Sequence, residues 1–199
     1  MSIKAVIFDI GGVCYLGRMK SAFKELSKEL NSKDVINIYH QNEEKLLKGE
    51  LEIKDFCMLV SKKVKMNHND IHKTIIKVWK NYFIPNKELL IIIHKLSKKY
   101  KIACLSNATK FDTELDKITG FDKIFNPYIN SCDYGLVKSN KEFLLLVLKK
   151  LNLKASECVI IDDYELNVKV SESLGFKAIH FKNNIQLEEN LISLGLKFS

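Results

Sequence analysis

The 199-residue chain is short of cysteine, of arginine and of long apolar runs. Its five cysteines are scattered, odd in number and never spaced as C-x-x-C, which argues against a disulfide framework and against a zinc knuckle. No apolar run approaches the roughly 18 residues of a membrane span, and the N-terminus lacks the basic-then-apolar pattern of a signal peptide. We therefore expect a soluble, cytoplasmic protein that has no membrane partner.

Arginine is nearly absent, since Arg18 is the single arginine among 32 Lys and Arg residues. The net charge of +8 invites a nucleic-acid interpretation, but bidentate contacts to phosphates and bases favour arginine. The lysines are also spread over the whole chain instead of forming one stripe. We predict no nucleic-acid partner, and only a mild attraction for anionic substrates.

What is present begins with residues 4–15, KAVIFDIGGVCY. The short apolar run over 5–8 is rich in β-branched and aromatic residues, which predicts a strand buried on both faces. Asp9 ends this run, and Gly11 and Gly12 follow at once, where glycines permit a sharp turn and exposed N–H groups. An acid at the end of a buried strand is poorly explained by stability alone.

Residues 18–98 show helical patterns and no strand signal. We expect helices over 19–30, 34–48, 54–65, 70–82 and 86–99, the fourth capped within residues 68–70 and ended by Pro85. From residue 99 strands and helices alternate. We expect strands at 101–106, 124–129, 158–161 and 178–181, and helices at 110–118, 139–151, 167–174 and 185–195.

This order predicts an α/β protein with a Rossmann-like parallel sheet of about five strands and helices on both faces. The expected core comprises residues 1–16 and 99–199, and residues 17–98 form an inserted α-helical cap. Polar residues end three of the apolar strands, and in such sheets ligands bind outside the carboxyl ends of the strands. These residues are Asp9, Ser106 and the pair Asp162 and Asp163.

Three carboxylates at one edge would repel each other unless a cation lay between them, and oxygen ligands of this kind suit Mg²⁺. A carboxylate beside Mg²⁺ can attack phosphorus, while Ser106 can donate to a phosphoryl oxygen. A lysine would balance the remaining charge, and Lys138 is a candidate because it directly precedes an expected helix.

Four segments together resemble the motifs of the haloacid dehalogenase (HAD) superfamily, in order, spacing and strand context: Asp9-x-Gly11-Gly12-Val13, Leu105-Ser106-Asn107, Gly135-x-x-Lys138 and Asp162-Asp163-x-x-x-Asn167. The helical insertion, with residues 49–56, resembles the small cap of subfamily I. Within the superfamily, the chain resembles the small Mg²⁺-dependent phosphatases, including those that act on sugar phosphates such as glucose 1-phosphate.

The resemblance implies a phosphatase that hydrolyses a small phosphorylated metabolite through an aspartyl-phosphate. It makes Asp9 the nucleophile, with Ser106 and Lys138 as its catalytic partners. The implied Mg²⁺ ligands are Asp9, the Gly11 carbonyl, Asp162 and Asp163, of which Asp163 matches the direct ligand better than Asp162. The implied substrate-binding residues are Gly12, Ser106, Asn107 and Lys138. Asn167 would cap a helix or, less favoured, support the ligands.

Two positions depart from the superfamily pattern. Gly11 stands where most of these phosphatases carry a second aspartate as general acid and base, whose help is typically worth ~10²–10⁴ in rate. Tyr15, a cap residue or a metal-ordered water could replace it. Ser139 stands where a proline commonly follows the lysine, which we expect to loosen the turn only.

Several alternatives stay open. A 2-haloacid dehalogenase would use the same aspartate on carbon, and a degenerate member would bind a phosphorylated ligand without turnover. Cys14 could be mistaken for a nucleophile, although no His lies near it in sequence. Arg18 is either a surface charge or a contact for an anionic group, and Trp79 and Tyr82 belong to the cap core or form a sugar-stacking platform. The oligomeric state is open between monomer and homodimer.

Overall fold

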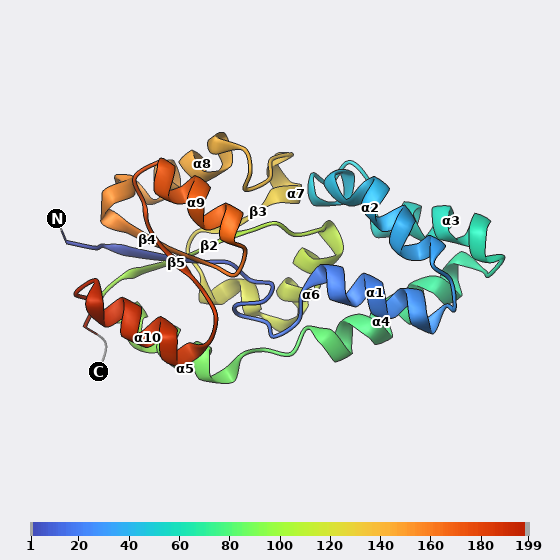
Figure 1. Ribbon diagram of the computed structural model, residues 1–199, viewed down its shortest axis with the longest axis horizontal. Coiled ribbons are helices and arrows are strands. Elements are labelled where there is room, and N and C mark those ends of the chain that lie inside the picture. The colour runs from blue at the N-terminus through green and yellow to red at the C-terminus, as the bar shows by residue number, and fades with distance from the viewer. Residues whose placement is uncertain (1, 198–199) are drawn as a thin grey trace.

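The computed structural model describes residues 2–197, whose centre is a five-stranded parallel sheet in the order β3-β2-β1-β4-β5 (Figure 1). The strands are β1 (Ala5–Phe8), β2 (Lys101–Ser106), β3 (Tyr128–Asn130), β4 (Cys158–Asp162) and β5 (Lys177–His180). β1 lies at the centre and is buried along its whole length, because helices cover both faces. This Rossmann-like α/β sheet confirms the predicted fold class.

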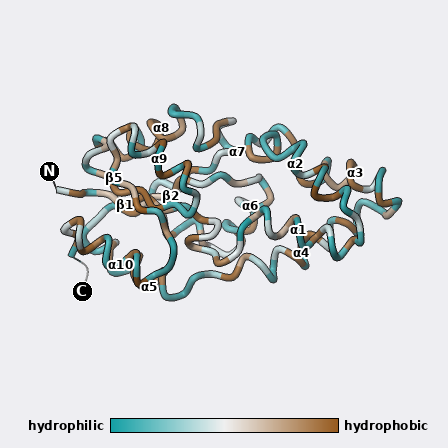
Figure 2. The backbone as a smooth tube through the Cα atoms, in the orientation of Figure 1, coloured by the Kyte–Doolittle hydropathy of each residue, from teal (hydrophilic) through white to brown (hydrophobic). Residues whose placement is uncertain are grey.

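Alternate residues of each strand face opposite layers of helices. On one face Val6 and Phe8 pack with α5 (Lys87–Ser97) and α10 (Asn184–Ser193). On the other face Ala5 and Ile7 pack with α8 (Lys141–Leu151) and α9 (Glu165–Ser173). Figure 1 shows these two helix pairs on opposite sides of the sheet, and Figure 2 shows the strands as its most apolar part.

Four helices form a separate bundle at the far end of the molecule from the two termini (Figure 1). They are α1 (Met19–Glu29), α2 (Asp34–Leu47), α3 (Ile53–Val64) and α4 (His68–Tyr82). An apolar core of their own holds them together, in which Phe23 stacks on Tyr39 and meets Trp79 edge to face. Trp79 is buried there, which supports its assignment to the cap core and argues against a stacking platform for sugars.

Four short segments complete the described part of the chain. They are α6 (Lys110–Thr119), η1 (Phe121–Ile124), α7 (Ser131–Tyr134) and η2 (Ala155–Glu157). Two of them, α6 and α7, lie beside the helical bundle. Three polar contacts join the bundle to α6 and α7: Trp79 Nε1 donates to Asp112 Oδ1 at 2.7 Å, Ser131 Oγ donates to the Leu47 carbonyl at 2.6 Å, and Lys110 Nζ lies 3.1 Å from Glu52 Oε1. The bundle is therefore anchored to the ends of β2 and β3, close to the polar edge of the sheet.

The third strand lies later than expected. We expected it over 124–129, but a 3₁₀ helix occupies Phe121–Ile124 and β3 begins only after Pro127, which has no N–H for the ladder. The short helix α7 was not predicted, and α4 begins two residues early with Asn67 as its cap. None of these shifts changes the order of the sheet.

The insertion was expected to extend to residue 98. α5, however, buries Leu89 and Ile93 against the sheet together with Val6. We therefore propose that the cap ends near Pro85 and that α5 belongs to the core. Among the helices in residues 2–197, none combines the length and the apolar character needed to cross a bilayer.

Candidate active site

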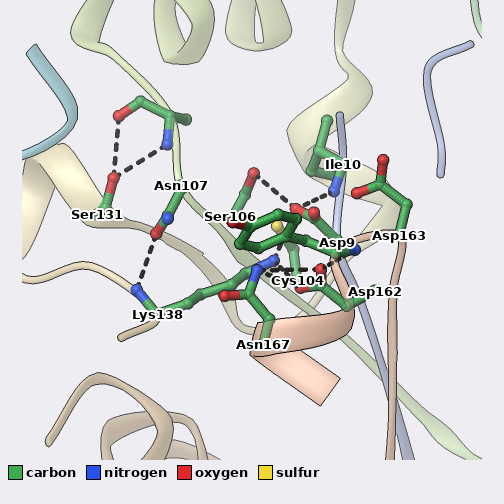
Figure 3. A network of polar contacts seen from close by, with 12 residues as sticks. Asp9, Ile10, Cys104, Ser106, Asn107, Ser131, Lys138, Asp162, Asp163 and Asn167 are labelled. Atoms are coloured by element: carbon green, nitrogen blue, oxygen red, sulfur yellow. Dashed lines mark hydrogen bonds and ion pairs between the residues drawn. The ribbon is translucent and has the colours of Figure 1, made fainter. Parts of the chain in front are cut away.

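The carboxyl ends of β1, β2 and β4 lie side by side, and the sheet order reverses between β1 and β4. Such a reversal opens a crevice in which parallel sheets bind ligands. Asp9 follows β1, Ser106 ends β2 and Asp162 ends β4. The fold thus brings together residues that are about 150 positions apart in the sequence (Figure 3).

The two oxygens of Asp9 have different surroundings. Oδ1 accepts from the Ile10 N–H at 2.7 Å and from Ser106 Oγ at 3.1 Å, and it lies 2.8 Å from Lys138 Nζ. Oδ2 has no donor among residues 2–197. Burial raises the pKa of Asp9 to about 7, which Lys138 opposes and the charge of Asp162 reinforces. Asp9 is therefore held firmly through Oδ1, while Oδ2 is left without a donor within the described residues.

Lys138 is the buried cation of the site, with a side chain only 1% exposed. Its Nζ lies 2.8 Å from Asp9 Oδ1 and 2.6 Å from Asp162 Oδ2. Burial by itself would lower the pKa of Lys138, but the charges of Asp162 and Asp9 raise it above its usual range. The ammonium group of Lys138 is therefore held between two carboxylates, which favour its charged form.

Asp162 is saturated with donors. Besides Lys138, it accepts from the Tyr164 N–H at 2.9 Å, and Asn167 Nδ2 lies 3.0 Å from Oδ1 and 3.1 Å from Oδ2. The favoured expectation that Asn167 caps a helix is wrong, because α9 begins at Glu165 with Tyr164 as its cap. Asn167 instead fixes the Asp162 carboxylate, which in turn fixes Lys138.

Asp163 forms its ion pair with a different residue, Arg18. Its Oδ2 pairs with Arg18 Nε, and Gly12 lies against both groups, so that a Cβ atom on Gly12 would overlap the Asp163 carboxylate. Gly12 also has a positive φ of 76°, which favours glycine. Burial raises the pKa of Asp163, and the guanidinium of Arg18 opposes this rise.

Gly12 and Asn107 were predicted to contact substrate, but the structure gives both of them internal partners. The Gly12 N–H donates to the Gly17 carbonyl at 2.9 Å, so it is not the exposed donor that the sequence led us to expect. Asn107 Oδ1 accepts from the Lys138 N–H at 2.9 Å. In this structure Gly12 makes room for Asp163, and Asn107 positions Lys138.

Two further candidates lose their chemical role. Cys14 is fully buried, and burial raises the pKa of its thiol, so it is not a thiolate nucleophile. The Tyr15 hydroxyl donates to Asp116 Oδ1 at 2.7 Å, and burial raises the pKa of Tyr15 as well. Tyr15 is thus engaged elsewhere and does not replace the acid that is missing at Gly11.

The donor set fits a divalent cation. Asp9, Asp162 and Asp163 each offer an oxygen atom, and these atoms lie within 4.8 Å of one another. Three carboxylates face one lysine and one arginine, which leaves a net charge of minus one on the cluster. Oxygen ligands with excess negative charge are those that hard cations such as Mg²⁺ prefer.

The family model for haloacid dehalogenase-like hydrolases matches residues 3–169, which is most of the chain and includes every residue of this cluster. The chain belongs to this family. The HAD-like hydrolase is 22% identical over 205 residues to bifunctional epoxide hydrolase 2 of Mus musculus, covering 92% of this chain and 37% of the relative. It spans less than two fifths of each curated relative that it matches.

Solved structures show the same fold. A HAD-like family hydrolase from Porphyromonas gingivalis superposes with a TM-score of 0.80 at 21% identity, covering 96% of this chain and 98% of the other. A HAD family enzyme from Bacteroides thetaiotaomicron, an aspartate-to-alanine variant in complex with magnesium and inorganic phosphate, gives 0.77 at 20% identity, covering 91% and 95%.

In this HAD-like hydrolase, Arg18 is more than the surface charge that was one of its two expected roles. Its guanidinium pairs with a carboxylate of the cluster. Its rarity and its place just after the Gly11-Gly12 segment were the available signals. The partnership itself depends on tertiary structure, because Asp163 is far away in the sequence.

Proposed function

We propose that this HAD-like hydrolase is a Mg²⁺-dependent phosphatase that hydrolyses a small phosphate monoester, such as a sugar phosphate. The observation that carries the proposal is Asp9 itself. One of its oxygens is held by three donors and the other has none among the described residues, while Asp163 and Asp162 offer oxygens within 4.8 Å. A fixed carboxylate with one free oxygen beside a cation site is suited to attack phosphorus.

In the proposed first step, an oxygen of Asp9 forms a bond to phosphorus and the bond from phosphorus to the ester oxygen breaks. Ser106 and Lys138 hold the phosphoryl oxygens, and Lys138 balances their charge. Asp9, Asp163, Asp162 and the Gly11 carbonyl would hold Mg²⁺, which offsets the repulsion between the carboxylate and the phosphate. Water supplies the proton that the leaving oxygen needs.

In the second step, water attacks the phosphorus of the aspartyl-phosphate and the bond to Asp9 breaks. Inorganic phosphate leaves and the carboxylate is restored. Because Gly11 carries no side chain and the Tyr15 hydroxyl is bonded to Asp116, no protein acid is assigned to either step. We therefore expect slower turnover with poor leaving groups than with p-nitrophenol, whose oxygen leaves without a proton.

The test measures phosphate release from p-nitrophenyl phosphate with Mg²⁺ and with EDTA. Asp9→Asn should abolish release, whereas Asp70→Asn, which makes the same charge change on an exposed residue of α4, should leave it unchanged. Wild-type rates in Asp9→Asn would refute the mechanism. A panel of sugar, nucleotide and cofactor phosphates then identifies the substrate.

Two other functions predict different results in these assays. A 2-haloacid dehalogenase would release halide in EDTA, but its chemistry gives no reason for the pair Asp162 and Asp163. A degenerate member, which the glycine at position 11 favours, would be stabilised by a sugar phosphate with Mg²⁺ and would release no phosphate from any compound of the panel.

A further inference from the structure

Arg18 connects the interior of the candidate active site with the solvent. Its Nε pairs with Asp163 Oδ2, and the Arg18 side chain is 60% exposed while that of Asp163 is 8% exposed. Arg18 is also the residue directly before α1, where the chain passes from the sheet into the helical bundle. The guanidinium therefore lies at the boundary between the two parts of the molecule.

The local backbone is adapted to this ion pair. Gly12 has a positive φ and packs against both the Asp163 carboxylate and Arg18 Nε, with no space for a Cβ atom. Its N–H donates to the Gly17 carbonyl, which holds the residue before Arg18 against the segment that follows Asp9. The pair is thus built into the turn, unlike a chance contact between two surface side chains.

The two cations of the cluster serve different carboxylates. Lys138 lies between Asp9 and Asp162, whereas Arg18 contacts Asp163. If a divalent cation bound Asp163 while Arg18 remained there, two positive groups would share one carboxylate at short range, which is unfavourable. Within residues 2–197 Asp163 is the one ion-pair partner of Arg18, so the arginine is free to leave once this carboxylate is taken.

We propose that Arg18 holds Asp163 in the metal-free protein, yields this carboxylate to Mg²⁺, and then binds the phosphate group of the ligand. This inference rests on the proposed function, because it takes Asp163 as a metal ligand. A guanidinium offers several N–H donors in a planar fork that matches phosphate oxygens. Arg18 is the one side chain in the sequence with that geometry.

Binding measurements on Arg18→Gln test the inference without any turnover. Mg²⁺ is titrated into the metal-free protein by calorimetry, and inorganic phosphate is then titrated into the Mg²⁺-saturated protein. Removing the competing ion pair should tighten Mg²⁺ binding, by about fivefold if this pair is as strong as the strongest solvent-exposed ion pairs. Loss of the guanidinium should weaken phosphate binding by at least a similar factor.

Lys20→Gln is the matched control, because Lys20 is exposed on α1, two residues from Arg18, and carries the same charge. A general field effect would be screened over about 10 Å at 0.1 M salt, so this variant should change either affinity by less than about twofold. Tighter Mg²⁺ binding together with weaker phosphate binding is therefore expected in Arg18→Gln and not in Lys20→Gln.

Several results would overturn the inference. Weaker Mg²⁺ binding in Arg18→Gln would mean that Arg18 supports the Asp163 ligand instead of competing for it. Unchanged affinity of Arg18→Gln for Mg²⁺ or for phosphate would refute the proposal that Arg18 leaves Asp163 and binds phosphate. A wild-type protein that binds no Mg²⁺ would refute it as well. The phosphatase proposal is tested separately: it fails if the wild-type protein releases no phosphate.

Discussion

The contact between Trp79 and Asp112 gives the sharpest prediction for how the helical bundle is held to the sheet. Trp79 Nε1 on α4 donates to Asp112 Oδ1 at 2.7 Å, and both residues are buried. The other oxygen of Asp112 accepts from the N–H and hydroxyl of Thr109, at 2.9 and 2.7 Å. Trp79→Phe keeps an aromatic ring but leaves Asp112 Oδ1 without its donor.

A hydrogen bond to a charged group contributes about 1.5–3 kcal/mol, and leaving the buried oxygen unpaired costs an amount in this range. We expect the free energy of unfolding of Trp79→Phe to fall by roughly 2–3 kcal/mol at pH 8. Urea unfolding followed by circular dichroism measures this loss, because the variant removes the only tryptophan of the chain and with it the fluorescence signal.

The loss should depend on pH. Burial raises the pKa of Asp112 above 3.8, against the lowering effect of its donors Trp79 and Thr109. A carboxyl whose pKa is raised in the folded state keeps its proton to a higher pH there than in the unfolded chain. The free energy of unfolding therefore falls as the pH rises from 3.8 through the folded pKa. Removing the Trp79 donor raises that pKa further, and each added pKa unit costs about 1.4 kcal/mol at high pH.

Trp79→Phe should therefore cost more at pH 8 than at pH 5. Tyr82→Phe is the matched control on the same helix, since it removes a longer, partly exposed hydrogen bond of 3.3 Å to Glu25 and should cost less than about 0.5 kcal/mol. In an Asp112→Asn background, Trp79→Phe should lose most of its effect. A cost that is equal at both pH values and in both backgrounds would show that Trp79 acts through packing alone.

Three predictions concern the cluster itself. Asn167→Leu should lower kcat for phosphate release about 10–100-fold, because it frees the Asp162 carboxylate, and it should destabilise the fold less than Trp79→Phe does, because Lys138 and the Tyr164 N–H still donate to Asp162; an unchanged kcat contradicts this. Lys138→Met should lose about 3–5 kcal/mol in urea unfolding, since it leaves Asp9 and Asp162 without their buried cation; a loss below 1 kcal/mol refutes it. Gly12→Ala and Gly120→Ala, both at positive φ, should share a backbone cost of about 1–2 kcal/mol, but Mg²⁺ binding should weaken in Gly12→Ala alone, where the Cβ meets Asp163; equal Mg²⁺ affinities would refute the steric argument.

The sheet could be predicted because its signals are local. A short apolar run that ends in an acid, as at Asp9, indicates both a buried strand and its polar end, and parallel strands bring such ends to one edge. The predicted bounds of the third strand were wrong, and the reason is also local. Pro127 interrupts the expected 124–129 segment, and a 3₁₀ helix over Phe121–Ile124 takes up its first residue.

The partners within the cluster were harder to predict, because they depend on where helices begin and on tertiary contacts. Asn167 was expected at a helix start, but α9 begins two residues earlier, so its amide meets Asp162 instead. Gly12 was expected to offer its N–H, which the Gly17 carbonyl takes. Arg18 meets Asp163 only because the turn at Gly12 folds back on the end of β4.

The hydrogen bonds of the cluster separate carboxylates that the sequence treats alike. Asp162 is fully buried and both of its oxygens accept donors, so a reaction at this residue would have to break contacts that hold Lys138. Asp9 shares the same lysine, but its donors among residues 2–197 all converge on Oδ1 and leave Oδ2 without one. The proposed assignment of Asp9 as nucleophile and Asp162 as support follows from this difference in hydrogen bonding.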